Sequence, residues 1–208
     1  MNEATAERGD ASFVAARSTD LLLVPGLRDS GPAHWQTHWE RDLGARRVVQ
    51  DDFERADLER WSDRIVETVH AGGRDIVLVA HSFGCLAAVH AAPRLARHLR
   101  ALMLVAPASP VKFGIEHALW RPVEVPSLLV ASRNDPWLSF DGARELVKRW
   151  SSRLHDLGHA GHINADSGYG PWPEGLELLS GLIDRTLDRA ARRPAASLMA
   201  TIQAMSLG

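Results

Sequence analysis

Hydrophobic residues in this chain gather in short continuous runs that end at turn residues, instead of alternating with polar residues. Runs of this length are typical of strands that are buried on both faces of a sheet. Four of them cover residues 20–26, 75–81, 101–107 and 127–132, and two weaker ones cover 45–50 and 152–158. The pattern predicts six strands, with the two weaker ones nearer the sheet edges.

The segments between these runs have the periodicity of amphipathic helices. In residues 57–71, for example, Leu58, Trp61 and Ile65 share one helical face, and a Gly-Gly pair follows. The expected helices cover residues 34–44, 57–71, 83–92, 139–150 and 174–192. Strand alternating with helix predicts the α/β class, with a mainly parallel sheet covered by helices on both faces.

The chain length of 208 residues suits one domain. Residues 1–18 are polar, rich in alanine and without a sustained period, which predicts a mobile N-terminal arm. Residues 19–192 contain all the predicted strands and helices and form the expected single domain. We expect residues 193–208, which begin next to the helix breaker Pro194, to form a C-terminal tail.

Composition and charge restrict the kinds of partner and location. The chain has 24 Lys and Arg against 26 Asp and Glu, so no basic surface for nucleic acid or anionic membrane is expected. No apolar run approaches the roughly 18 residues that suggest a membrane span. The N-terminus lacks the apolar core of a secretory signal, and Cys85 is the single cysteine. These features predict a cytoplasmic protein without disulfides.

A serine stands directly at the end of a predicted strand. Residues 80–84 read Ala-His-Ser-Phe-Gly, and a helix-compatible segment follows. This is close to the Gly-x-Ser-x-Gly nucleophile elbow, a strained strand-to-helix turn that presents the serine above the sheet. The residues two before and two after the serine must be small because strand and helix nearly touch there. The pattern predicts Ser82 as a nucleophile, and the alternative is a serine that caps a helix.

A serine nucleophile needs a base within hydrogen-bond reach and an acid that orients the base. Asp135 stands just past the strand 127–132, where turn chemistry alone is the other explanation. Histidines 155, 159 and 162 follow the last predicted strand, which completes the chain order Ser, Asp, His. His162 has the loop length to swing back over the serine, whereas His159 lies almost at the strand end. A metal site of three histidines is the alternative.

Backbone N–H groups are expected to stabilise the oxyanion that develops during acyl transfer. We expect them from Phe83, directly after the nucleophile, and from Leu27, in the loop after the first strand. His34 and Trp35, close to that loop, and Trp137, shortly after the predicted acid, are expected to bind substrate. Packing in the core is the alternative for these aromatic side chains.

Four motifs, VPGLRDSGPAHWQTHWE, AHSFGC, ASRNDPW and GHINADSGYGPWPEG, resemble the small serine hydrolases of the retinoblastoma-binding-protein-nine and YdeN type. Together they span about residues 21–180. The resemblance implies a compact α/β-hydrolase fold, a triad of Ser82, Asp135 and His162, and esterase-like or peptidase-like activity. Ala80 departs from the strict first glycine of the elbow motif.

These features predict a serine hydrolase that cleaves a small ester or related acyl bond through an acyl-enzyme intermediate. The connection over residues 107–126 has room for one short helix at most, a minimal lid that favours small acyl groups. The expected partner is a small-molecule acyl substrate, with no cofactor, metal, nucleic acid or membrane, and the oligomeric state is left open. The alternatives are a peptidase or thioesterase with the same triad and a hydrolase-shaped protein-binding module.

Overall fold

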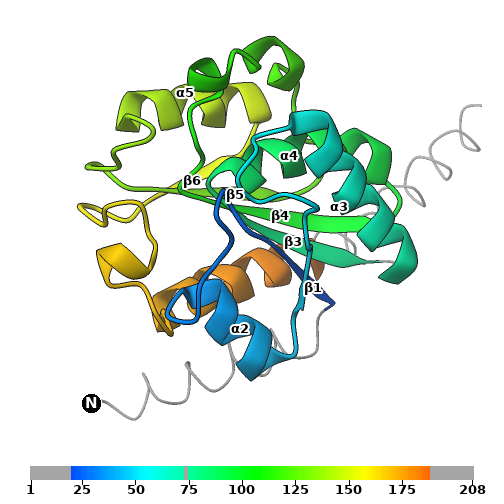
Figure 1. The fold of residues 1–208 in the computed structure, drawn as a ribbon, viewed down its shortest axis with the longest axis horizontal. Coiled ribbons are helices and arrows are strands. Elements are labelled where there is room, and N and C mark those ends of the chain that lie inside the picture. Colours follow the sequence, from blue (N-terminus) through cyan, green and yellow to red (C-terminus); the bar gives the residue numbers. More distant parts are fainter. Residues whose placement is uncertain (1–19, 73–74, 188–208) are drawn as a thin grey trace, which may run out of the picture.

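The computed structural model describes residues 20–72 and 75–187, and a six-stranded sheet lies at its centre (Figure 1). The strand order is β2-β1-β3-β4-β5-β6, and every neighbouring pair is parallel. The strands are β1 (Leu21–Val24), β2 (Arg46–Arg47), β3 (Ile76–His81), β4 (Leu99–Val105), β5 (Ser127–Ala131) and β6 (Arg153–Asp156). The predicted α/β class with a mainly parallel sheet is confirmed.

The strand pattern of the sequence is reproduced with one difference in length. The two weaker runs form the two edge strands, as expected. However, β2 has only two residues instead of the six expected from 45–50. Its neighbour Val48 is buried and still donates its N–H to Leu23 O at 2.9 Å, but Val49 is 64% exposed. The chain therefore leaves the sheet edge directly after Val48, whose side chain packs in the core.

Helices cover both faces of the sheet, as Figure 1 shows. They are α2 (Trp35–Leu43), α3 (Leu58–Gly72), α4 (Phe83–Ala91), α5 (Phe140–Trp150) and a helix over residues 173–187. Helices α3, α4 and α5 pack on one face, and α2 and the helix 173–187 pack on the other. All five expected helices are present within the described residues, and the predicted end of the last one, 188–192, lies outside them.

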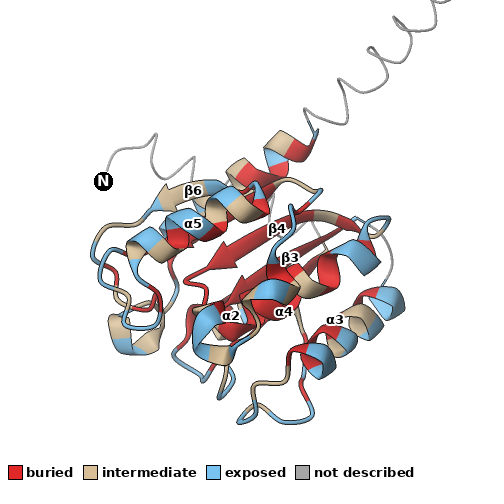
Figure 2. Cartoon of the chain, turned by 90° about the horizontal axis from the view of Figure 1, so that it is seen from above, coloured by how far each residue is buried: buried red, intermediate tan, exposed pale blue. Residues whose placement is uncertain are grey.

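Two hydrophobic cores result from the alternation of side chains along the strands. In β3, Ile76, Leu78 and Ala80 face α3 and α4, while Val77 and Val79 face α2. Figure 2 shows the central strands β3 and β4 as buried and the edge strand β6 as partly exposed, with the other exposed residues on the outer sides of the helices. A strand with a core on each side needs apolar residues at every position, which explains the continuous runs in the sequence.

The connection between β4 and β5 contains two single-turn 3-10 helices, η2 (Pro110–Phe113) and η3 (Glu116–Leu119), where at most one short helix was expected. Gly114 separates them, because its left-handed backbone, with φ 65°, ends the first turn. The cover over this part of the sheet edge is nevertheless short, in agreement with a minimal lid.

The predicted N-terminal arm, residues 1–18, and the predicted tail, residues 193–208, lie outside the described part of the chain. Within residues 20–72 and 75–187, no helix has both the length and the apolar character needed to cross a bilayer.

Candidate active site

The turn between β3 and α4 has the geometry of a nucleophile elbow. Ser82 adopts φ 53° and ψ −124°, a conformation that is costly for a residue with a side chain. Helix α4 and the neighbouring strand β1 approach so closely that a Cβ on Gly84 would lie 2.6 Å from Val24 O. Likewise, a Cβ on Gly26 would lie 2.7 Å from Ser82 Cβ. The buried methyl group of Ala80 is accommodated in place of the first glycine.

Three side chains from the carboxyl ends of different strands meet at this turn. Ser82 follows β3, Asp135 follows β5 and His162 follows β6. Ser82 Oγ lies 2.9 Å from His162 Nε2, and His162 Nδ1 lies 2.9 and 3.0 Å from the two oxygens of Asp135. Because a carboxylate only accepts, Nδ1 carries a hydrogen and the neutral ring leaves Nε2 free to accept from the serine hydroxyl. The structure thus brings together the three residues predicted as a triad.

The acidic member of this group is held by its own turn. The N–H of Trp137 donates to Asp135 Oδ1 at 2.8 Å. The side chain of Asp135 is only 3% exposed and that of His162 only 9%. Turn chemistry and orientation of a histidine, two explanations considered for Asp135 from the sequence, therefore hold at the same time.

The other two histidines of this region lie apart from Ser82. His159 is exposed on the loop after β6. His155 lies in β6, and its Nε2 is 3.7 Å from Glu174 Oε1. Among the residues that the structure describes, no three His, Cys, Asp or Glu side chains are placed to hold a metal ion.

A pocket of about 440 Å³ opens beside Ser82. Its apolar walls include Leu27, Phe83, Phe113 and Trp137, and the Trp137 side chain is 46% exposed at the pocket. Volume and lining are within the range of small-molecule sites. The predicted positions of Leu27, Phe83 and Trp137 beside the nucleophile therefore agree with the structure.

The backbone N–H groups of Leu27 and Phe83 are available to a ligand. Among the described residues neither group donates to a protein acceptor, while the next loop amide, Arg28, donates to Phe53 O at 2.9 Å. Leu27 follows Gly26, whose added Cβ would lie 3.3 Å from Ser82 Oγ. Both amides thus belong to the immediate surroundings of the serine oxygen.

His34 lines the same pocket, as expected, and also begins helix α2. Its Nδ1 accepts from the N–H of Gln36 at 3.2 Å, so its Nε2 carries the hydrogen of the neutral ring. Burial lowers the pKa of His34 to about 4, and electrostatic repulsion from Arg47 and from a protonated His162 adds to this effect. The ring is therefore neutral at neutral pH.

Trp35 differs from the expectation, because the structure does not bring it to the pocket. Its side chain is fully buried in the core under α2, with ring centroids 4.8 Å from Trp39 and 5.3 Å from Trp172. The four-residue spacing of Trp35 and Trp39 directs both rings towards the sheet. Its indole N–H donates to Ile163 O at 2.9 Å, so it contacts the loop that carries the histidine instead of the pocket.

Several polar residues that hold this loop were missed in the sequence. The N–H groups of residues 160, 161 and 162 donate to Ser132 Oγ, Asn134 Oδ1 and Ser167 Oγ at 2.9, 2.8 and 3.1 Å. Asn134 and Ser132 precede the candidate acid, and their positions next to it were the only available signal.

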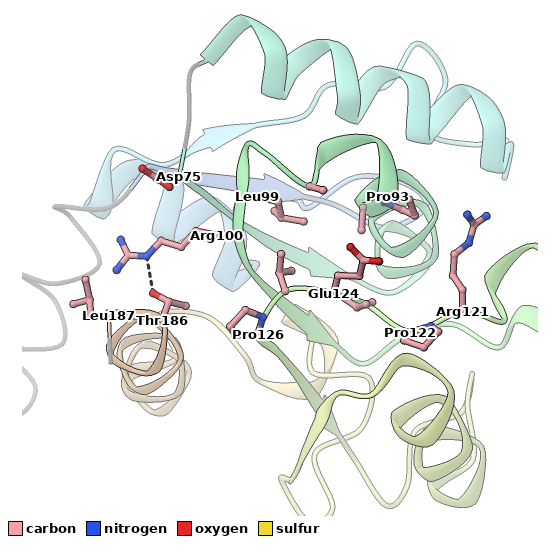
Figure 3. A pocket seen from close by; sticks show the side chains of 14 residues that line it. Asp75, Pro93, Leu99, Arg100, Arg121, Pro122, Glu124, Pro126, Thr186 and Leu187 are labelled. Carbon is pink, nitrogen blue, oxygen red and sulfur yellow. Dashed lines mark hydrogen bonds between the residues drawn. The ribbon is translucent and has the colours of Figure 1, made fainter. Parts of the chain in front are cut away.

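A larger groove of about 1150 Å³ lies at the opposite end of the sheet (Figure 3). Asp75, Leu99 and Pro126, which stand at the amino ends of β3, β4 and β5, contribute to its lining. Among the described residues, the lining contains no serine, cysteine or histidine. The groove therefore lacks the nucleophile and base that meet at the carboxyl ends of the strands.

The chain is similar to known hydrolases in sequence and in structure. Residues 21–181 match a family model described as serine hydrolase. The YdeN protein of Bacillus subtilis, named as a hydrolase, is 24% identical over 189 residues, which cover 79% of this chain and 96% of the relative. The structure of a YdeN-like hydrolase from Pectobacterium atrosepticum is 40% identical, with a TM-score of 0.81 over 86% of this chain and 98% of the other.

A more distant structure extends the comparison of folds. Mouse alpha/beta hydrolase domain-containing protein 10 has a TM-score of 0.60 at 15% identity, covering 82% of this chain and 90% of the mouse chain. At this identity the likeness concerns the fold alone. The predicted α/β-hydrolase type of sheet is confirmed.

Proposed function

The chain belongs to the serine hydrolase family, and we propose that it cleaves a small ester or related acyl bond with Ser82, His162 and Asp135 as its catalytic triad. The observation that carries this proposal is the hydrogen-bonded series from Ser82 Oγ through His162 to Asp135, located on a strained turn beside a pocket. A pure binding protein has no need for three matched side chains in this order.

The reaction would proceed in two halves. Ser82 Oγ attacks the carbonyl carbon of the ester while His162 Nε2 takes the hydroxyl proton. His162 then returns the proton to the leaving alcohol as the carbon–oxygen bond breaks, which leaves an acyl group on Ser82. Water, deprotonated by the same nitrogen, attacks the acyl carbon. The bond between that carbon and Ser82 Oγ then breaks as His162 returns the proton to Ser82 Oγ, which releases the acid and restores the enzyme. Asp135 keeps Nδ1 protonated and stabilises the imidazolium in both halves.

The tetrahedral intermediates carry a negative oxygen that needs donors. We assign this role to the backbone N–H groups of Leu27 and Phe83, which have no acceptor of their own among the described residues. Donors that are already in place where the charge develops lower the barrier without reorganisation. No step of this mechanism calls for a metal or a cofactor.

The dimensions of the site favour a small substrate. A pocket of about 440 Å³ lies at the lower end of the usual range for small-molecule sites, and Phe113 of η2 lines it. We place the substrate between Phe83, Phe113 and Trp137, with His34 forming part of the wall. An acyl group with a long lipid chain would extend beyond these walls into solvent.

A fluorophosphonate probe tests the nucleophile directly. We expect labelling of the wild type and none of Ser82→Ala, while Ser180→Ala, a serine on the helix 173–187, labels like the wild type. The same three proteins are then assayed on matched esters, thioesters and aminoacyl amides to separate esterase from thioesterase and peptidase activity. Labelling that persists in Ser82→Ala contradicts the nucleophile, and a folded wild type that never labels favours the binding module.

A further inference from the structure

The histidine that precedes the nucleophile is bonded to the histidine that would act as base. His81 Nε2 lies 2.9 Å from the backbone oxygen of His162, and the His81 side chain is buried. Since a carbonyl oxygen only accepts, His81 must hold a hydrogen on Nε2. The contact joins the last residue of β3 to the loop after β6, residues that are 81 positions apart in the chain.

The backbone around His162 is strained and needs such support. Gly161 has φ 58° and Ile163 has φ 48°, so left-handed residues stand on both sides of the base. For a β-branched residue such as Ile163 this conformation is unfavourable and persists only where surrounding contacts impose it. Two donors hold the carbonyl groups here: His81 on His162 O, and Trp35 on Ile163 O at 2.9 Å.

The surroundings of His81 keep its ring neutral and its orientation constant. Its centroid lies 4.8 Å from both the His34 ring and the His162 ring. Burial lowers the pKa of His81 well below that of free histidine, and the neighbouring His34 and His162 lower it further. A neutral His81 adds no second positive charge beside His162 when that ring takes the serine proton.

We propose that His81 is a positioning residue, whose Nε2–H holds the His162 carbonyl and thereby keeps the His162 ring between Ser82 and Asp135. The inference rests on the proposed triad and adds a role to the residue that directly precedes the nucleophile. The elbow thus supplies two functions from consecutive residues, the nucleophile at Ser82 and a donor for the base loop at His81.

Substitutions at His81 separate the donor from the bulk of the ring. His81→Leu fills the buried space without a donor, whereas His81→Gln places an amide N–H at a similar reach. We expect His81→Leu to lose roughly ten- to a hundredfold in kcat, the scale of an ångström-sized misplacement, with KM within twofold of the wild type. His81→Gln should recover most of the loss. The rate of labelling by the fluorophosphonate should follow kcat.

The control is His90→Leu, the same exchange at a half-buried histidine of α4 that contacts Ser62 and lies outside the pocket lining. It should keep the wild-type kcat. If His81→Leu does not fold, His81→Asn, whose amide is one methylene too short, takes its place in the comparison with His81→Gln. Equal kcat for the donor-bearing and donor-deficient variants, or a rise in KM at unchanged kcat, overturns the role of His81.

The same assays keep the two proposals apart. Loss of labelling in Ser82→Ala together with full activity in a folded His81→Leu rejects the positioning role alone. Persistent labelling of Ser82→Ala rejects the triad, and the role of His81 with it.

Discussion

The two ends of the sheet differ in what their loops contain. At the carboxyl ends of the strands, the pocket of about 440 Å³ is lined by the nucleophile Ser82 and the base His162, and the acid Asp135 is buried behind the base. At the amino ends, the groove of about 1150 Å³ has more than twice the volume, but the charged residues described in its lining, Asp75, Arg100, Arg121 and Glu124, form no series of nucleophile, base and acid (Figure 3). Volume therefore does not locate chemistry in this molecule, whereas the convergence of three strand ends does.

Backbone strain occurs at both ends of the sheet, since Asp75 at the amino-end groove also has a positive φ of 62°, but at the carboxyl end it involves three strands. Ser82, Ala106 and Ile163 have positive φ values directly after β3, at the end of β4 and in the loop after β6. All three lie at the carboxyl end, around the candidate site. Strained residues persist where the surrounding structure imposes them, and such positions gather at functional sites. The loop 160–163 illustrates how this is achieved, because side chains from other segments hold its amides and carbonyls.

The largest expected effect on activity comes from removing the candidate base at the carboxyl-end site. His162→Ala should lower kcat by about three to four powers of ten or more, the scale seen when a triad member is removed. His159→Ala, three residues earlier and exposed, should keep most of the activity, and so should His155→Ala. Steady-state kinetics on one activated ester measure all three variants. An inactive His159→Ala beside an active His162→Ala would refute the assignment of the base.

A smaller effect is expected where the backbone approaches the nucleophile. In Gly26→Ala the new Cβ would lie 2.7 Å from Ser82 Cβ, so the serine or the Leu27 loop must shift. We expect kcat to fall by roughly a hundredfold, the cost of a small misplacement at the reacting centre. Gly31→Ala is the matched control in the same loop, because nothing lies within 4 Å of its added Cβ. Similar kinetics for both variants would contradict the close packing at the elbow.

Much of this arrangement could be predicted from the sequence, since it depends on local patterns. The four continuous apolar runs became β1, β3, β4 and β5, because a strand between two cores has no polar position. The candidate triad was predictable because its members come after three different strands in the chain order Ser, Asp, His. The length of edge strand β2 was overestimated. An edge strand has a pairing partner on one side only, so an apolar residue such as Val49 can lie in solvent.

Contacts between distant side chains could not be read from the same patterns. Trp35 was expected beside the substrate because it lies close to the oxyanion loop in the sequence, but the helix turns its ring into the core, which was the alternative. His81 gave no signal for its bond to His162, because the two are joined only when β3 and the loop after β6 lie side by side. The spacing of residues predicts on which face of a helix or strand a side chain lies. Which residue it contacts there depends on tertiary packing.

Acid should destabilise the carboxyl-end site through His34. Its pKa is about 4 in the folded protein against about 6.5 when unfolded, so the unfolded chain binds more protons between these values. The contribution of His34 to the free energy of unfolding is therefore fully present above pH 6.5 and is lost as the pH falls towards 4. At pH 5 this loss lowers the free energy of unfolding by about 2 kcal/mol. Denaturant unfolding at pH 8 and pH 5 measures this drop in the free energy of unfolding. The drop should be smaller than in the wild type for His34→Asn, which retains a capping side chain, and equal to the wild type for His159→Asn.

The smallest effect is expected at the amino-end groove. Arg100 Nε donates to Thr186 Oγ1 at 2.6 Å across the lining shown in Figure 3. Thr186→Val removes the acceptor and leaves the Arg100 donor without it, which should cost about 1–3 kcal/mol in the free energy of unfolding. The double variant Arg100→Met with Thr186→Val removes both partners and should be closer to the wild type than the single variant. Neither variant should change kcat or KM on esters by more than about twofold, because substitutions at distant sites act independently and the carboxyl-end site stays intact. A tenfold loss of kcat in the stable double variant would mean that the amino-end groove is coupled to the catalytic site, and the two ends of the sheet would then not be independent.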